Sequence, residues 1–524
     1  MREATFTGRA GVGLRSERGP VLGSVMLTTG LVALDSTIIA TAVPSVVRDL
    51  GGFSHFPWLF SIYLLTAAVM TPLYGKLADV LGRRPVMFFG IAAFLAGSVL
   101  CGAAWSMLTL IVFRAVQGIG AGAIQPMSMT IIGDLYTVQE RARVQGYVAG
   151  VWGVSSVVGP TLGGVFAEYL SWRWIFFINV PLGLIAVWML ARHLKENVER
   201  RQHRIDYLGA ALLIGGCTLL ILGTLEGGIS WAWLSAPSVA IFVVGAALVT
   251  AFVFVERRAA EPVLPLWVFR YRTLVGGNLA AVTIGALVIG LSSYVPNFAQ
   301  GVLGTGALLA GFVVAAMTLG WPIAATLSGR VYLRIGFRNT ALIGSAIIIA
   351  GTVMAALLTE QTTVGMISLA CFVIGVGLGL ASAPTLVAVQ SVVGWDRRGV
   401  VTGTNMFSRS IGSAVGAAVF GAIANTTLDR RFAAAPPDVR PALGSGADAT
   451  SIVLKAGHTP SAVADYVRSS LYTATHNVFV ALAVVGVCSL LVLLMIPRKI
   501  EELRRRDGPL TERDRLRKIV GGSG

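Results

Sequence analysis

Long apolar runs separated by short charged segments dominate the chain. A membrane-spanning helix needs about 20 predominantly apolar residues. Charge-poor runs near that length fall at roughly 21–43, 57–77, 86–105, 107–132, 144–167, 174–191, 207–225, 237–255, 339–358, 362–389, 400–424 and 471–496. The stretch 273–329 holds no charged residue and is too long for one span, so Pro296-Asn297 and the Gly301–Gly306 region divide it in two. The pattern therefore predicts an all-α integral membrane protein with 14 transmembrane helices.

The charges between the runs predict how the chain is oriented. An even number of spans places both termini on one side, and cytoplasmic loops carry an excess of Lys and Arg. With segment 1–20 as a cytoplasmic tail, 32 of the 41 Lys and Arg fall on that side. Segment 1–20 is not read as a secretory signal, because the apolar run after it is too long and lacks a small-residue cleavage site. We therefore expect a multi-pass membrane protein whose N- and C-termini are both cytoplasmic.

Two polar segments lie outside this pattern. The insert 425–470 is rich in Ala, Pro, Asp and Ser and is expected on the outer side, as a short helical cap or an unstructured loop. The segment 498–524 is a basic cytoplasmic tail, and its charge pattern favours an amphipathic surface helix. The net charge of +16 fits basic loops beside anionic lipid headgroups and requires no nucleic acid.

Cysteines and histidines, which commonly act in catalysis or bind metals, do not occur here at spacings typical of a catalytic or metal site. The four cysteines all lie inside apolar runs, and the five histidines are scattered along the chain. No segment has the glycine and lysine pattern of a phosphate-binding loop, so ATP is not expected to supply the energy. We therefore expect a protein that is not an enzyme and that needs no metal or cofactor.

The most specific short motif lies between the second and third runs, in the sequence Gly75-Lys-Leu-Ala-Asp79-Val-Leu-Gly82-Arg83-Arg84-Pro. A basic cytoplasmic loop alone would account for its charge. The order of its residues, however, resembles the loop between spans two and three of the major facilitator superfamily. That resemblance implies a cytoplasmic latch that holds one of the two alternating-access states, formed by Gly75, Asp79, Gly82, Arg83 and Arg84.

A weaker echo of this motif occurs at 329–338, where glycine and arginine recur at similar offsets without the acid. Parallel halves with repeated loops are typical of this superfamily. Together with the fourteen runs, the echo predicts an N-terminal six-helix bundle at 21–206 and a C-terminal six-helix bundle at 257–497. The two extra transmembrane helices are expected at 207–256.

Asp35 is the one acid that lies deep inside an apolar run. A charged residue at the bilayer centre costs about 2.5–3.5 kcal/mol on insertion scales, so Asp35 must face protein or a water-filled cavity. A carboxyl group in that position suits the uptake and release of a proton; structural pairing with an arginine is the plainer interpretation. The segment 31–44 also resembles span one of the fourteen-span drug:proton antiporters, which implies a role for Asp35 in coupling.

A polar stripe begins at Arg114 in the fourth run. Gln117, Ala121, Gln125 and Ser128 follow it at spacings of three or four residues, so they share one helix face. Such a stripe is expected to line a cavity, and we assign Gln117, Gln125 and Ser128 to the substrate cavity. The surrounding sequence resembles the family's span-four motif, which implies that Arg114 takes part in proton transfer. Structural pairing of Arg114 with a carboxylate is the alternative.

The fifth run contains the string Gly159-Pro160-Thr-Leu-Gly163-Gly164. Small residues at helical spacing are common wherever membrane helices pack. The string as a whole resembles the antiporter motif of the drug-exporting branches of the superfamily. Pro160 removes one helix hydrogen bond and permits a kink, while Gly159, Gly163 and Gly164 permit close packing.

These resemblances imply a proton-coupled exporter of small amphipathic compounds, including drugs, in the bacterial inner membrane. The proton gradient would be its energy source, and a monomer is expected. Export of an endogenous lipid, siderophore or secondary metabolite by the same mechanism is the main alternative. Sugar:proton symport or uniport is disfavoured by the antiporter motif, and a membrane-bound enzyme or sensor has no supporting motif.

Overall fold

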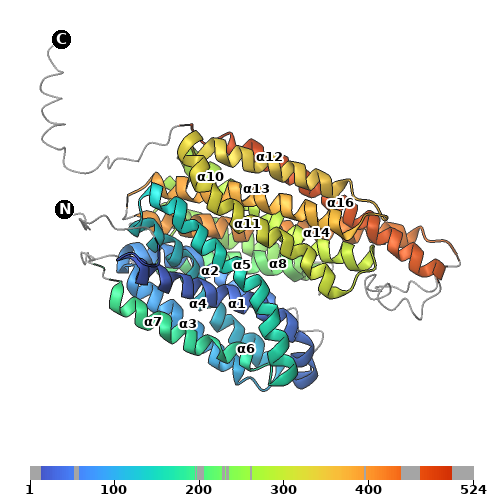
Figure 1. Ribbon diagram of the computed structural model, residues 1–524, viewed down its shortest axis with the longest axis horizontal. Helices are drawn as coiled ribbons and strands as arrows, with labels where there is room; N and C mark the ends of the chain where they lie inside the picture. The colour runs from blue at the N-terminus through green and yellow to red at the C-terminus, as the bar shows by residue number, and fades with distance from the viewer. Residues whose placement is uncertain are drawn as a thin grey trace, which may run out of the picture.

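The computed structural model describes residues 13–51, 58–194, 196, 206–226, 231, 235–259, 262–394, 397–437, 439 and 461–498. Within these residues, 14 helices are long and apolar enough to cross a membrane. They run side by side along the long axis of the molecule (Figure 1). This arrangement confirms the predicted all-α fold. The predicted tail 498–524 lies outside the described residues, apart from Arg498.

The N-terminal bundle contains the first six spans, and the sixth span consists of two consecutive helices. Their bounds are α1 Gly19–Leu50, α2 Trp58–Leu81, α3 Arg83–Gly102, α4 Met107–Leu135, α5 Val138–Tyr169, α6 Trp174–Phe177 and α7 Asn179–His193. Capping boxes at Ser106 and Thr137 satisfy free backbone N–H groups where α4 and α5 begin. Within the bundle, α4 packs against both α2 and α3, and α5 packs along α1.

The C-terminal bundle contains the last six spans and is preceded by a short 3₁₀ helix. Their bounds are η2 Leu266–Phe269, α10 Arg272–Gly301, α11 Ala307–Ile335, α12 Phe337–Ala356, α13 Val364–Ser391, α14 Arg398–Ala433 and α16 Ser461–Leu493. Both α14 and α16 extend beyond their predicted spans into the segment 425–470. The remainder of that segment, apart from a few residues after α14, lies outside the described residues.

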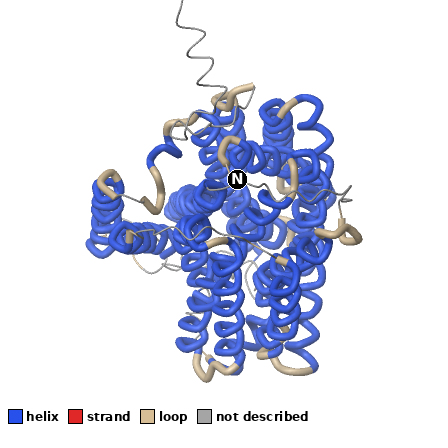
Figure 2. The backbone as a smooth tube through the Cα atoms, turned by 90° about the vertical axis from the view of Figure 1, so that its left-hand side faces the viewer, coloured by secondary structure: helices blue, strands red, loops and turns tan. Residues whose placement is uncertain are grey.

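The extra pair of spans consists of α8 Tyr207–Glu226 and α9 Ala236–Glu256, which pack on each other. Gly216 and Gly245 lie where the two helices cross, since a Cβ on either glycine would approach the other's carbonyl oxygen. In addition, α8 contacts both α2 and α14, and an apolar cluster joins these three helices. The pair therefore lies beside the two bundles on their α2–α14 side, which the end-on view in Figure 2 also shows.

The two bundles repeat the same local structure. Gly82 and Gly336 both have positive φ, +98° and +86°, and each joins two long helices through a turn that other residues rarely adopt. On α4 and α13, three alternate glycines pack against the neighbouring helices of the same bundle. These are Gly118, Gly120 and Gly122 on α4 and Gly375, Gly377 and Gly379 on α13. The echo at 329–338 therefore belongs to a structural repeat.

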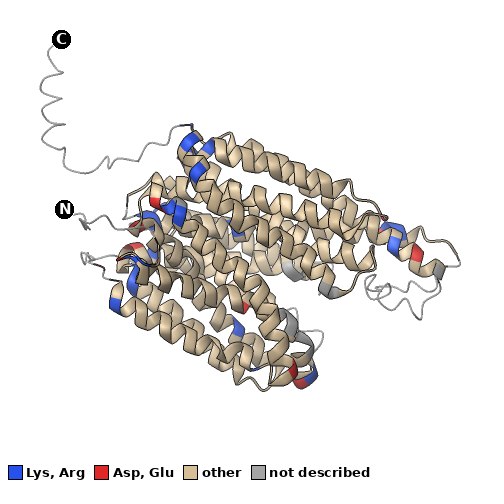
Figure 3. Ribbon diagram, viewed as in Figure 1, with Lys and Arg blue, Asp and Glu red and all other residues tan. Residues whose placement is uncertain are grey.

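Charged side chains separate the two ends of the molecule. Most described Lys and Arg lie at the end where α2 meets α3 and α11 meets α12, and Figure 3 shows this clustering. We call this the basic end. At this end, the N-terminal bundle contacts the C-terminal bundle through α2 with α14 and α5 with α11. The opposite end carries a smaller group of charges, including the pair Asp49–Arg173.

Candidate functional site

The acid at the centre of α1 is fully enclosed by the N-terminal bundle. Asp35 and Arg114 are each only 1% exposed, and Arg114 Nη1 lies 2.6 Å from Asp35 Oδ2. The other carboxylate oxygen, Oδ1, accepts hydrogen bonds from Gln117 Nε2 at 2.7 Å and from Asn179 Nδ2 at 3.3 Å. Two helices, α4 and α7, therefore supply partners to one carboxylate on α1.

The guanidinium of Arg114 makes hydrogen bonds and a ring contact in addition to its ion pair with Asp35. Its Nε donates to the Leu59 carbonyl at 3.1 Å, and its Nη1 donates to Gln117 Oε1 at 2.7 Å. The Tyr63 ring lies beneath it, 4.2 Å from the guanidinium carbon to the ring centroid. Gln117 continues the network to Ser98 Oγ on α3, at 2.8 Å. The site thus joins α2 and α3 to the three helices around Asp35.

Charge balance dominates the energetics of this network. Removing one partner of a buried ion pair typically costs 3–5 kcal/mol, because the other charge stays buried without compensation. Two further polar atoms, Tyr63 Oη and Asn179 Oδ1, are buried without a partner among the described residues. Protonation of Asp35 would therefore remove the negative charge that compensates Arg114, and few other described groups at the site could replace it.

The remaining members of the α4 stripe lie nearer the basic end. Ser128 is buried, and its hydroxyl lies 3.5 Å from that of Thr28 on α1. Gln125 is half-buried, whereas Gln117 is fully enclosed in the Asp35 network. The stripe thus brings Gln117 and Ser128 against neighbouring helices of the same bundle. Their assignment to a substrate cavity stays a prediction.

The C-terminal bundle has no equivalent of this network at the matching positions. Arg114 and Gln117 precede the first glycine of α4 by four residues and by one residue. The corresponding positions on α13 are Cys371 and Ile374, and both belong to a buried apolar cluster. The repeat therefore retains the glycine packing in both halves but places the buried charges in only one.

One further arginine lies inside a span of the C-terminal bundle. Arg409 on α14 is half-buried, and its guanidinium has no hydrogen-bond or ion-pair partner among the residues that the structure describes. On the same face, Asn405 donates from Nδ2 to the Gly277 carbonyl at 3.0 Å. Arg409 is therefore separate from the Asp35 network, and we assign it no role in coupling.

The predicted latch joins the two bundles at the basic end. The two Asp79 carboxylate oxygens accept the backbone N–H groups of Gly399, at 3.0 Å, and Val400, at 2.8 Å. These N–H groups lie in the first turn of α14, where backbone N–H groups are free and the helix dipole favours a negative charge. The glycines at the crossing bring the helices close, because a Cβ on Gly75 would lie 2.7 Å from the Gly399 carbonyl oxygen.

Arg83 connects this contact to a second acid. Its Nη2 lies 2.9 Å from Asp79 Oδ1, and its Nε lies 2.9 Å from Asp134 Oδ2 at the end of α4. Arg398, from the start of α14, reaches Asp134 Oδ1 at 3.1 Å. Two arginines and two acids thus form one chain of charges across the junction of the two halves.

Gly82 and Arg84 hold the turn between α2 and α3 within the N-terminal half. The Glu196 carboxylate accepts the backbone N–H groups of Arg83 and Arg84, both at 2.8 Å, and so caps α3. The Arg84 side chain donates to the Ala191 carbonyl on α7 at 3.1 Å. Arg84 is therefore bound to its own half, whereas Asp79 crosses to the other.

The antiporter motif on α5 faces α1 close to the buried acid. A Cβ on Gly159 would overlap Thr37 Oγ1, and Thr37 donates to the Ser155 carbonyl at 3.0 Å. Thr37 is only two residues from Asp35. Gly163 is buried and Pro160 is half-buried, whereas a Cβ on Gly164 would meet nothing within 4 Å. Of Gly159 and Gly164, Gly159 therefore has the tighter packing constraint.

Sequence reasoning does not single out several side chains of these two sites. They include Tyr63, Ser98, Asn179, Asp134, Arg398 and Glu196. Asn179 follows aromatic residues at the entrance to the sixth span, and such residues are ordinary interface anchors. Its position in the sequence therefore gives no sign of its contact with Asp35. Asp134 and Arg398 lie at helix ends, where charged residues are common. Their pairing becomes visible only when the two halves are placed together.

The chain is a polytopic membrane protein of two repeated six-helix halves with buried charges in one of them. A family model described as Major Facilitator Superfamily matches residues 25–417, so the chain belongs to this family of transporters. It is 36% identical over 416 residues to the Multidrug transporter protein MdtP of Bacillus subtilis (strain 168), covering 78% of this chain and 77% of that protein.

Other relatives share this similarity. The chain is 35% identical over 427 residues to Multidrug resistance protein 3 of Bacillus subtilis (strain 168), covering 82% of this chain and 83% of the relative. It is 29% identical over 492 residues to the Efflux pump dotC of Dothistroma septosporum (strain NZE10 / CBS 128990), covering 91% and 84%. The crystal structure of the human organic anion transporter MFSD10 (TETRAN) has the same fold, with a TM-score of 0.60 at 14% identity over 91% of this chain and 99% of that one.

Proposed function

We propose that the protein is a proton-coupled exporter of small amphipathic compounds, including drugs, across the bacterial inner membrane. The observation that carries the proposal is the enclosed carboxylate of Asp35, paired with Arg114 in the middle of the membrane-spanning region. Ionisable residues inside a membrane are costly and commonly mark proton or substrate pathways. The relatives named as multidrug transporters support export of drugs as the substrate class.

The proposed coupling begins with protonation of Asp35. A proton on this carboxyl group cancels the charge that balances Arg114 and weakens the hydrogen bonds that Asp35 accepts. Because Thr37 lies two residues further along α1 and packs on Gly159, a small shift of α1 is transmitted to α5. Helix α5 in turn contacts α11 of the other half. The buried charge and the interface between the halves are thereby linked through one helix pair.

The contacts of Asp79 support assigning the structure to a state closed at the basic end. With Asp79 bound to the N-terminus of α14, the two halves are held together at the basic end. The excess of Lys and Arg supports placing this end in the cytoplasm. On that orientation the protein is closed towards the cytoplasm. Loss of the Asp79 contacts is then required before a substrate can enter from the cytoplasmic side.

Transport by inverted membrane vesicles tests this function. In such vesicles the cytoplasmic face lies outside, so an exporter should accumulate substrates when the interior is acidic. We expect several amphipathic dyes from a panel to accumulate in a manner that a protonophore abolishes, and vesicles without the protein provide the baseline. Accumulation that ignores the proton gradient, or that requires ATP, would contradict proton coupling.

The contact between Gly159 and Thr37 yields a separate prediction. A methyl group at Gly159 would collide with Thr37 Oγ1, so Gly159→Ala must displace α5 from α1. We expect proton-driven transport to fall by about tenfold or more, since overpacking costs about 1–3 kcal/mol. Gly164→Ala in the same motif is the control, because its new methyl group meets no atom within 4 Å. Equal transport rates in the two variants, measured at equal expression, would show that the α1–α5 contact does not limit transport.

A further inference from the structure

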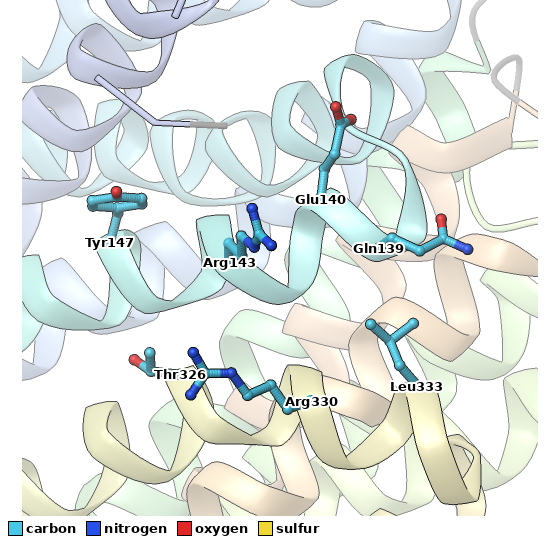
Figure 4. Close-up of a pocket in the computed structure, with 7 residues that line it drawn as sticks. All are labelled: Gln139, Glu140, Arg143, Tyr147, Thr326, Arg330 and Leu333. Atoms are coloured by element: carbon cyan, nitrogen blue, oxygen red, sulfur yellow. The ribbon is translucent and has the colours of Figure 1, made fainter. Parts of the chain in front are cut away.

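A cleft at the basic end lies between α5 of the N-terminal half and α11 of the C-terminal half. It has a volume of about 590 Å³, and Figure 4 shows the residues that line it. Those residues are Gln139, Glu140, Arg143, Tyr147, Thr326, Arg330 and Leu333. The cleft is separate from the Asp35 network and lies beside, not within, the latch. Because its two walls belong to different halves, any ligand that contacts both walls bridges them.

The cleft carries an excess of positive charge. Arg143 on α5 and Arg330 on α11 are both exposed, and neither has a partner among the described residues. The acid in the cleft, Glu140, is already engaged: Arg18 Nη1 lies 3.0 Å from its Oε2, and the same oxygen accepts the Thr137 backbone N–H at 2.9 Å. Two guanidinium groups therefore remain available to an anion.

The inner side of the cleft is closed by direct contacts between the halves. Tyr332 donates from its hydroxyl to the Val138 carbonyl at 3.3 Å. Deeper in the membrane, Thr326 packs against Gly146, and Pro322 packs against Gly153. An anion that binds the two arginines must therefore enter from the side or from the aqueous surface. It would add to contacts that already hold the two halves together at this end.

The outer side of the cleft leads to an apolar surface. The Tyr147 ring and Leu333 are exposed beside the arginines. Further along the same two helices, Val154 is 63% exposed on α5 and Ile323 is 52% exposed on α11. In a membrane protein such side chains face the acyl chains of lipids. A basic group at the headgroup level above an apolar surface matches the two parts of a phospholipid.

We propose that this cleft binds the phosphate group of an anionic phospholipid, which Arg143 and Arg330 grip from opposite halves. The guanidinium fork suits phosphate oxygens, and two arginines match a headgroup that carries a net negative charge. A ligand that binds only when both walls are close stabilises the state closed at the basic end. The lipid thereby regulates the conformational equilibrium, a role that goes beyond the proposed export activity and does not depend on proton coupling.

The test compares lipids added to the purified full-length protein in detergent. We expect phosphatidylglycerol to raise the midpoint of thermal unfolding above that in phosphatidylcholine by about 2 °C or more. The double variant Arg143→Gln/Arg330→Gln should lose this difference. The matched control is Arg192→Gln/Arg258→Gln, which removes two exposed arginines of the basic end outside the cleft and should retain it. The midpoint in phosphatidylcholine reports whether each variant is folded.

A second measurement follows the conformation directly. Spin labels at His193 on α7 and Asn339 on α12, both exposed at the basic end, report the separation of the two halves. Phosphatidylglycerol should increase the population with the short distance in the parent but not in the cleft variant. Equal stability in both lipids, or an unchanged lipid effect in the cleft variant, would overturn the proposal. Equal stabilisation by inorganic phosphate alone would identify a soluble anion as the ligand and overturn the lipid assignment.

Discussion

Asp35→Asn is expected to abolish transport driven by a pH gradient while leaving the protein folded enough to purify. The substitution preserves the volume of the side chain but removes the charge that balances Arg114, 2.6 Å away. An asparagine neither titrates nor compensates a guanidinium. Cationic substrates should bind more weakly and lose the pH dependence of their binding, whereas neutral substrates should still bind. Asp35→Glu is expected to retain partial function.

The measurement is substrate-induced proton release from purified protein, followed from about pH 5.5 to about pH 8.5. Asp49→Asn is the matched control, because Asp49 also lies on α1 but is exposed at the opposite end, where it pairs with Arg173. The control should release protons like the parent. Proton release by the Asp35→Asn variant at the parental level would place the coupling carboxylate elsewhere.

A double variant separates loss of coupling from loss of stability. Asp35→Asn leaves Arg114 buried without compensation, which costs about 3–5 kcal/mol. In Asp35→Asn/Arg114→Gln the charges are balanced again, so the thermal unfolding midpoint should recover relative to the single variant. Proton-driven transport should stay absent in both. Recovery of transport together with stability would mean that Asp35 only supports the fold.

The sequence predicts the charged residues of the Asp35 site but not its uncharged ones. A charge inside an apolar run is rare, and for that reason the sequence indicates both Asp35 and Arg114 as site residues. Ser98 and Tyr63 carry no such signal, because hydroxyl and aromatic residues are ordinary in membrane helices. The sequence predicts Gln117 as a cavity residue, since helical spacing gives the helix face on which it lies but not the residue that it contacts. Its contact with Asp35 required the positions of α1 and α4.

The latch shows a different limit. The order of residues between α2 and α3 predicts its acid, Asp79, and its arginines, Arg83 and Arg84. Across the two halves, Asp79 accepts the backbone N–H groups of Gly399 and Val400. Because every residue except proline has a backbone N–H group, the residue types do not reveal this contact. The predicted spans are also shorter than some helices, because composition marks an apolar run and not the residue where a helix ends. Helix α14 continues to Ala433, well past the predicted span 400–424, because a helix can extend from the membrane into polar surroundings.

Weakening the latch should change the rate of transport more than the binding of substrate. Asp79→Asn keeps one acceptor oxygen, but it loses the ion pair with Arg83 and one of the two contacts to α14. Hydrogen bonds to a charged group contribute about 1.5–3 kcal/mol. The closed state should be destabilised by about that amount, and turnover should fall by about tenfold or more because each cycle must return through that state. Expression and substrate affinity should stay near parental values.

Glu196→Gln provides a closely matched control for this prediction. Like Asp79, Glu196 accepts two backbone N–H groups at the start of a helix, but its partners, at Arg83 and Arg84, belong to its own half. The two substitutions therefore make the same chemical change, and only Asp79→Asn weakens a contact between the halves. Turnover in vesicles and the distance between labels at His193 and Asn339 should change in Asp79→Asn alone. Parental turnover in Asp79→Asn would mean that the loop only sets the orientation of the chain in the membrane; an equal loss in Glu196→Gln would mean that turnover depends on capping at the basic end and not on contact between the halves.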